Sequence, residues 1–177
     1  MTPFRFSLLL IGALSACSRT KEADNPRIEL SDVGFALHLP PAMQRAMDSL
    51  APGFRSVRAS SFRSDVSQAA AAEGGGSSPA AFAAVGDFDH NGSIDAVVEG
   101  TAPGDTALRV IAILNGKKPT AMNVTRFPMY DADAVGIYLT NPPAGMAAAF
   151  EVVAYPDSTM LFKYEDGAFQ GERVGTQ

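Results

Sequence analysis

The sequence predicts an α+β fold, in which one or two N-terminal helices pack on a single antiparallel β-meander sheet. Helical patterns occur only in the first half of the chain, between residues 41 and 73. From residue 80 onward, short β-type segments alternate with turns that contain Gly, Pro, Asn or Asp. Such short links join neighbouring antiparallel strands, because a parallel crossover needs about a dozen residues or more.

The elements before the sheet are short strands and two helices. Residues 35–39 alternate as a half-buried strand does, and Ile28 with Leu30 predicts a second short strand. Four apolar side chains then recur at helical spacing: Met43, Ala46, Met47 and Leu50. Residues 68–73 favour another helix, which ends at a Gly-Ser linker, residues 74–78.

Eight segments then have the pattern of β-strands. Their predicted bounds are residues 80–85, 96–100, 107–114, 121–126, 135–140, 148–155, 159–164 and 168–173. Turn sequences such as Asn115-Gly116 and Asp166-Gly167 stand between them. In these turns, glycine and self-bonding polar side chains let the backbone reverse.

The N-terminus carries a targeting pattern. Arg5 precedes an apolar run, residues 6–14, which is too short to span a bilayer, since that takes about 20 apolar residues. The sequence Leu14-Ser15-Ala16-Cys17 at its end resembles the lipobox of bacterial lipoproteins. The resemblance implies cleavage before Cys17, the only cysteine, and lipidation of its thiol. The alternative is an ordinary secretory signal ending near Ala16, with Cys17 as a free thiol.

This pattern divides the chain into a signal peptide at residues 1–16, the lipidated cysteine and a polar tether at 17–26, and one globular domain at 27–177. The uncharged Ser18 is similar to a sorting pattern that favours the outer membrane over the inner one. The chain has 14 basic and 19 acidic side chains and a net charge of −5, which argues against nucleic acid as a partner. Its lack of Trp argues against a sugar-binding site.

An acidic loop, residues 86–95, is the only segment with a metal-ligand spacing, in the form D-x-D-x-N-G-x-x-D. In such a loop, oxygens at alternate positions converge because a glycine permits a sharp turn. The predicted calcium ligands are Asp87, Asp89, Asn91, Ser93 through its carbonyl, and Asp95. Gly92 supplies the turn, Ile94 is expected to point inward and His90 outward. Val98 stands where an EF-hand has its glutamate, so the loop is not an EF-hand.

Residues 85–98 resemble the FG-GAP or VCBS repeat, in which a glycine-aspartate-aromatic opening, here Gly86-Asp87-Phe88, leads into a calcium loop and a strand. The resemblance implies a structural calcium ion and a binding or adhesion role. The chain has one copy, too few to build the propeller that these repeats form. A longer stretch, from Pro41 to Phe169, resembles small secreted bacterial proteins that carry one such loop. The alternative for the loop is a set of self-capping turns without an ion.

The sequence carries no recognisable catalytic signature. Its two histidines, His38 and His90, stand in no zinc-protease motif, and no nucleophile elbow or phosphate-binding loop is present. Asp131 and Asp133 form a second acidic pair, which we interpret as a solvated turn. A periplasmic hydrolase with dispersed carboxylates, such as Asp133 with Glu151, stays open as an alternative.

The sequence thus predicts a membrane-anchored envelope lipoprotein, whose calcium-stabilised β-rich domain has a binding or structural role without catalysis. Two alternatives have recognisable signs. A hydrolase would gather acids of raised pKa in a cleft away from the loop. An inhibitor or accessory subunit of another envelope protein would expose an apolar patch near Phe127, Met129 and Tyr130.

Overall fold

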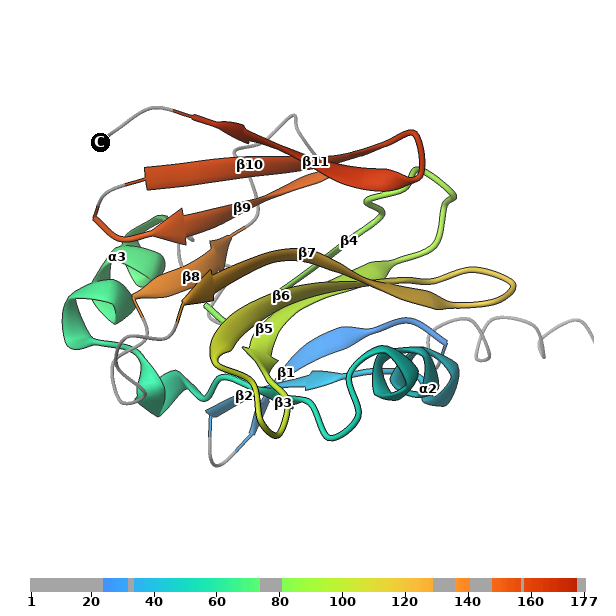
Figure 1. The fold of residues 1–177 in the computed structure, drawn as a ribbon, viewed down its shortest axis with the longest axis horizontal. Helices are drawn as coiled ribbons and strands as arrows, with labels where there is room; N and C mark the ends of the chain where they lie inside the picture. The colour runs from blue at the N-terminus through green and yellow to red at the C-terminus, as the bar shows by residue number, and fades with distance from the viewer. Residues whose placement is uncertain are drawn as a thin grey trace, which may run out of the picture.

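The computed structural model of the chain describes residues 24–31, 34–73, 81–128, 136–140, 148–156 and 158–174. Within this part, helices and antiparallel sheets form the α+β fold that the sequence predicts (Figure 1). Several predicted features lie outside it: the signal peptide, Cys17, most of the tether, the Gly-Ser linker and the Asp131-Asp133 pair.

The elements follow the predicted order, with two short additions between residues 55 and 61 that the sequence did not predict. They are β1 (Arg27–Ser31), β2 (Gly34–His38), α2 (Pro41–Leu50), β3 (Arg55–Ser56), the 3-10 turn η1 (Ala59–Ser61), α3 (Ser64–Glu73), β4 (Ala83–Gly86), β5 (Asp95–Thr101), β6 (Ala107–Leu114), β7 (Thr120–Pro128), β8 (Ile137–Thr140), β9 (Ala149–Ala154), β10 (Ser158–Glu165) and β11 (Ala168–Arg173). α3 begins four residues earlier than predicted, at Ser64, where Asp65 accepts a hydrogen bond from the N–H of Val66 in the first turn.

The prediction of one meander sheet is wrong, because the strands of the described residues separate into three antiparallel sheets. β1 and β2 form a hairpin of their own. The central sheet has the order β3-β5-β6-β7, and β4 also pairs with β5. The last four strands form a separate sheet with the order β11-β10-β9-β8.

Burial of both faces of the central sheet explains this separation. In β6, every residue from Val110 to Leu114 is buried. In a strand with one solvent-exposed face, buried and exposed residues would alternate. The sheet therefore needs a cover on each side. Figure 1 shows the β8–β11 sheet along one side of the central strands, and α2 with the β1–β2 hairpin along the other.

Two apolar clusters fill the spaces on either side of the central sheet. The first joins helix residues Met43, Met47 and Val66 to Val98 and Ile111 of the sheet. The second lies between the two larger sheets. Its buried members are Ala84, Phe88, Val97, Val110, Ala112, Leu139, Phe150, Val152 and Phe162.

Neighbouring residues of one strand thus enter different clusters, as strand geometry requires. Val97 belongs to the second cluster and Val98 to the first. The methionines of α2 pack in the first cluster, as their spacing predicts. Among the residues that the structure describes, no helix has both the length and the apolar character needed to cross a membrane.

Candidate metal centre

The acidic loop closes the hairpin between β4 and β5, and its two ends, Gly86 and Asp95, are the last residues that pair across the two strands. Phe88 anchors it: the side chain is 1% exposed, and its ring lies 5.4 Å from the Phe150 ring in the second cluster. Ile94 was expected to pin the loop, but it is only half-buried and belongs to neither cluster. Phe88 takes the inward position instead, because the adjoining sheet provides an aromatic partner, Phe150, for its ring.

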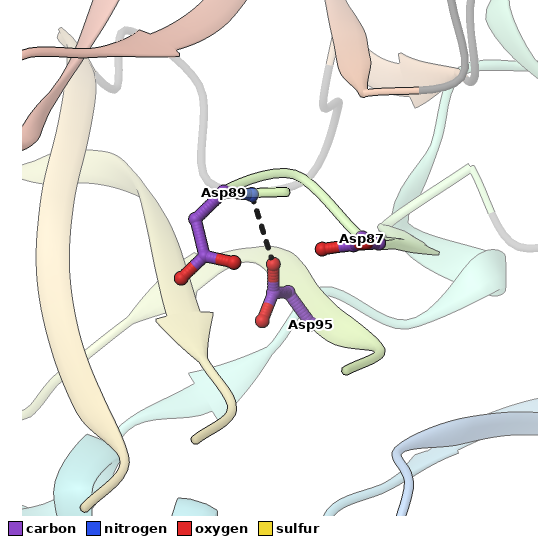
Figure 2. A group of neighbouring side chains, drawn as sticks. All are labelled: Asp87, Asp89 and Asp95. Atoms are coloured by element: carbon purple, nitrogen blue, oxygen red, sulfur yellow. Dashed lines mark hydrogen bonds between the residues drawn. The ribbon is translucent and has the colours of Figure 1, made fainter. Parts of the chain in front are cut away.

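Three carboxyl groups converge in this loop. Asp87, Asp89 and Asp95 each place a carboxylate oxygen within 4.8 Å of the other two. Figure 2 shows Asp87 and Asp89 approaching Asp95 from opposite sides. Asp95 is fully buried, and the other two are half-buried. Negative charges this close repel one another, and a cation between them would offset the repulsion. Such a group could therefore hold a metal ion.

Asp95 is the structural centre of the group. Its Oδ2 accepts hydrogen bonds from the N–H groups of Phe88, at 2.8 Å, and Asp89, at 3.4 Å. Its Oδ1 accepts the N–H of Asn115 at 2.7 Å. Burial raises the pKa of Asp95 to about 6, although the N–H donors of Asn115 and Phe88 act in the opposite direction. This side chain therefore ties both ends of the loop to the neighbouring β6–β7 turn.

The loop also contains the self-capping turns that the ion-free interpretation predicts. The N–H of Gly92 donates to Asp87 Oδ2 at 3.0 Å, and that of Asn91 donates to Asp89 Oδ1 at 3.1 Å. Gly92 has a φ of +82°, which confirms that the turn uses the conformational freedom of glycine. His90 is exposed as expected, and also has a positive φ, of +60°.

These turns leave one acceptor without a partner. Asp87 Oδ1 is buried and accepts no hydrogen bond. A buried carboxylate oxygen without a donor carries the full cost of its lost hydration. The hydrogen bonds of these turns therefore satisfy only some of the carboxylate oxygens in the loop. Asp87 Oδ1 is left without a donor, and a cation would be a suitable partner for it.

Asn91 and Ser93 are placed differently from the predicted ligand arrangement. The Asn91 Nδ2 donates to Asp89 Oδ2 at 2.8 Å and to the carbonyl of Asn115 at 2.7 Å. Its Oδ1 accepts the N–H of Ser93 at 2.7 Å. Asn91 thus presents its amide nitrogen to Asp89, and its carboxamide must turn before Oδ1 can act as a ligand on that side. The predicted role of the Ser93 carbonyl stays a prediction.

The sequence reading missed Glu99, a fully buried residue of β5. Neither of its carboxyl oxygens has a hydrogen-bond partner, and burial raises its pKa well above the usual range. Glu99 pairs with Val110 across the sheet and lies two residues after Val97, so it faces the second cluster. The signal available in the sequence was a single charged residue inside the apolar run of a strand.

The signs of the two alternative functions are only partly visible in the described residues. The pKa is raised for two described acids, Asp95 and Glu99, of which the first belongs to the loop and the second stands apart from it. His38 is exposed, with its Nε2 lying 3.3 Å from a Glu29 carboxylate oxygen. Phe127 is half-buried against the second cluster, and Met129 and Tyr130 lie outside the described residues.

The structure therefore brings together three of the five predicted ligands, Asp87, Asp89 and Asp95, and holds Asn91 beside them in another orientation. Comparison of the chain with protein-family models, with curated proteins and with solved structures found no match.

Proposed function

We propose that this protein is a bacterial envelope lipoprotein, whose β-rich domain binds calcium as a structural ion and serves as a binding or structural module without catalysis. The observation that carries the calcium assignment is Asp87 Oδ1. This oxygen is buried without a hydrogen-bond donor, in a group of three carboxylates whose ligand atoms lie within 4.8 Å. An ion in that group would supply the missing partner and screen the repulsion.

The donor chemistry favours calcium over zinc or magnesium. All three converging side chains offer carboxylate oxygen, and the exposed His90 of the same loop stands outside the group. Calcium takes six to eight oxygen ligands in flexible geometry, whereas magnesium demands a near-ideal octahedron and zinc prefers nitrogen and sulfur. The carboxamide oxygen of Asn91 and the carbonyl of Ser93 would add to the coordination, as the FG-GAP resemblance implies.

Calorimetric titration of the complete chain in detergent tests the calcium site. We expect saturable binding with a Kd of about 10⁻⁴ to 10⁻³ M, the range of extracellular calcium modules. Calcium at about ten times Kd should add about 1.4 kcal/mol to the free energy of unfolding. Asp87→Ala should abolish binding, because it removes the unpartnered oxygen.

The matched control is Asp48→Ala, which removes an exposed carboxylate on α2, and should bind calcium as the wild type does. Absence of saturable binding by the wild type up to several times 10⁻³ M calcium would contradict the proposal. The loop would then be a set of hydrogen-bonded turns.

The lipid anchor is supported by the lipobox sequence that ends at Cys17. In a Gram-negative host supplied with labelled palmitate, the wild type should incorporate label and sediment with membranes, the outer membrane in preference to the inner. Cys17→Ser should lose both the label and the membrane association, since the thiol carries the diacylglycerol. Ser18→Ala serves as the control, and a Cys17→Ser protein that still carries label would exclude the anchor.

A further inference from the structure

Asn115 connects the acidic loop to the start of the described chain. This residue follows β6 in the turn that leads to β7, and three of its polar groups bond to other segments. Its N–H donates to Asp95 Oδ1 at 2.7 Å, and its carbonyl accepts Asn91 Nδ2 at 2.7 Å. Its own side-chain Nδ2 donates to the carbonyl of Asp24 at 3.1 Å. One residue therefore contacts two members of the loop and the N-terminal segment.

The N-terminal segment leads into a hairpin with little internal support. Asp24 and the buried Pro26 precede β1, which among the described strands pairs with β2 alone, in a two-stranded sheet. An isolated two-stranded hairpin is marginally stable in water. Its attachment depends on contacts with the rest of the domain, through Ile28, Phe35 and Leu37 against the first cluster and through the Asn115 bond at its entrance.

We propose that calcium binding in the acidic loop tightens the attachment of this N-terminal hairpin, residues 24–31 and 34–38, through Asn115. The inference rests on the calcium site proposed above and concerns its regulation of a second region. An ion that orders Asp95 also orders the Asn115 N–H bonded to it, and so holds the Asn115 side chain in reach of Asp24. The loop and the hairpin entrance both bond to Asn115 in the β6–β7 turn. Once one of them has ordered this turn, the other attaches to it with a smaller loss of conformational entropy.

The coupling must act in both directions. If calcium favours the attached hairpin, then loss of the Asn115–Asp24 bond must weaken calcium binding by the same factor. Asn115→Ala removes only the side-chain amide and keeps the backbone N–H and carbonyl that contact Asp95 and Asn91. The variant therefore loses the bond to the hairpin entrance and keeps the contacts that support the ion site.

Hydrogen-deuterium exchange of the complete chain in detergent, with and without about 10 mM calcium, tests the coupling. In the wild type, calcium should slow exchange in residues 88–95 and also, by about fivefold or more, in residues 24–31. In Asn115→Ala, the loop should still respond while the response of residues 24–31 is lost, and calorimetry should show calcium affinity about fivefold weaker. Asn123→Ala, the same substitution at an exposed position of β7, should match the wild type.

The outcomes distinguish this inference from the calcium site itself. Calcium-dependent slowing confined to residues 88–95 in the wild type, or equal slowing of residues 24–31 in Asn115→Ala, would overturn the coupling and leave the ion site standing. No change in residues 88–95 together with no heat of binding would overturn both.

Discussion

Glu99→Gln is expected to raise the free energy of unfolding near pH 8 and to reduce its dependence on pH. Glu99 is fully buried in the second cluster without a hydrogen-bond partner, and burial raises the pKa of its carboxyl well above the ordinary value of 4.5. In the folded protein the carboxyl stays protonated at pH values where the unfolded chain has released that proton. The glutamine amide is nearly isosteric with the protonated acid and cannot ionise.

The sign follows from proton linkage. Above pH 4.5 the folded state binds more protons at this site than the unfolded state, so the free energy of unfolding falls as pH rises. The loss is about 1.4 kcal/mol per pH unit, until the pH passes the folded-state pKa. Wild type and Glu99→Gln should therefore have similar stability near pH 4.5 and diverge at higher pH, with the variant the more stable.

Denaturant titrations at a series of pH values measure this divergence. The raised pKa of Asp95, about 6, affects both proteins equally, so the difference between them isolates Glu99. Glu165→Gln, at an exposed position of β10, is the matched control and should follow the wild type. Parallel pH profiles of wild type and Glu99→Gln would show that Glu99 ionises in the folded state as it does in water.

Asp95→Ala is expected to lower the free energy of unfolding by roughly 3 to 5 kcal/mol even without calcium. The substitution leaves the N–H groups of Phe88, Asp89 and Asn115 without their carboxylate acceptor. Hydrogen bonds to a charged group contribute about 1.5 to 3 kcal/mol each, and a buried donor without a partner adds a further cost.

Asp87→Ala is the comparison that separates the structural role from ion binding. Asp87 accepts one bond, from the N–H of the exposed Gly92, and its other oxygen has no donor. We expect a change within about 1 kcal/mol in chelator, because one modest bond is lost and one repelling charge is removed. Denaturant titrations in chelator and in calcium measure both effects: each variant should lose the stabilisation by calcium, and only Asp95→Ala should lose stability in chelator. Equal losses in chelator would contradict the distinct roles assigned to the two aspartates.

The local elements of this fold were readable from the sequence because their patterns are local. The spacing of Met43 and Met47 predicts α2, and β6 lies at its predicted bounds, residues 107–114. The loop signature likewise identifies Asp87, Asp89 and Asp95, because the ligand spacing is contained in a few residues. The start of α3 was missed because its first turn is mostly polar and has Val66 as its one apolar side chain.

The arrangement of the strands was not readable from turn lengths. Short links indicate antiparallel neighbours, but they do not show where a sheet ends. β8 pairs with β9 and not with β7, and the last four strands cover the central sheet in place of extending it. The buried run in β6 was the available signal, since a strand buried throughout needs a cover on both faces.

The sequence by itself determined where the two helices and the longer strands form, and which short loop concentrates acidic ligands, since both depend on neighbours along the chain. Only the tertiary structure decided that Glu99 is buried without a partner, that Phe88 anchors the loop and that Asn115 joins it to Asp24. Burial and contacts between residues 91 positions apart depend on how the sheets stack. No local pattern specifies that stacking, because it results from the joint burial of apolar faces along the whole chain.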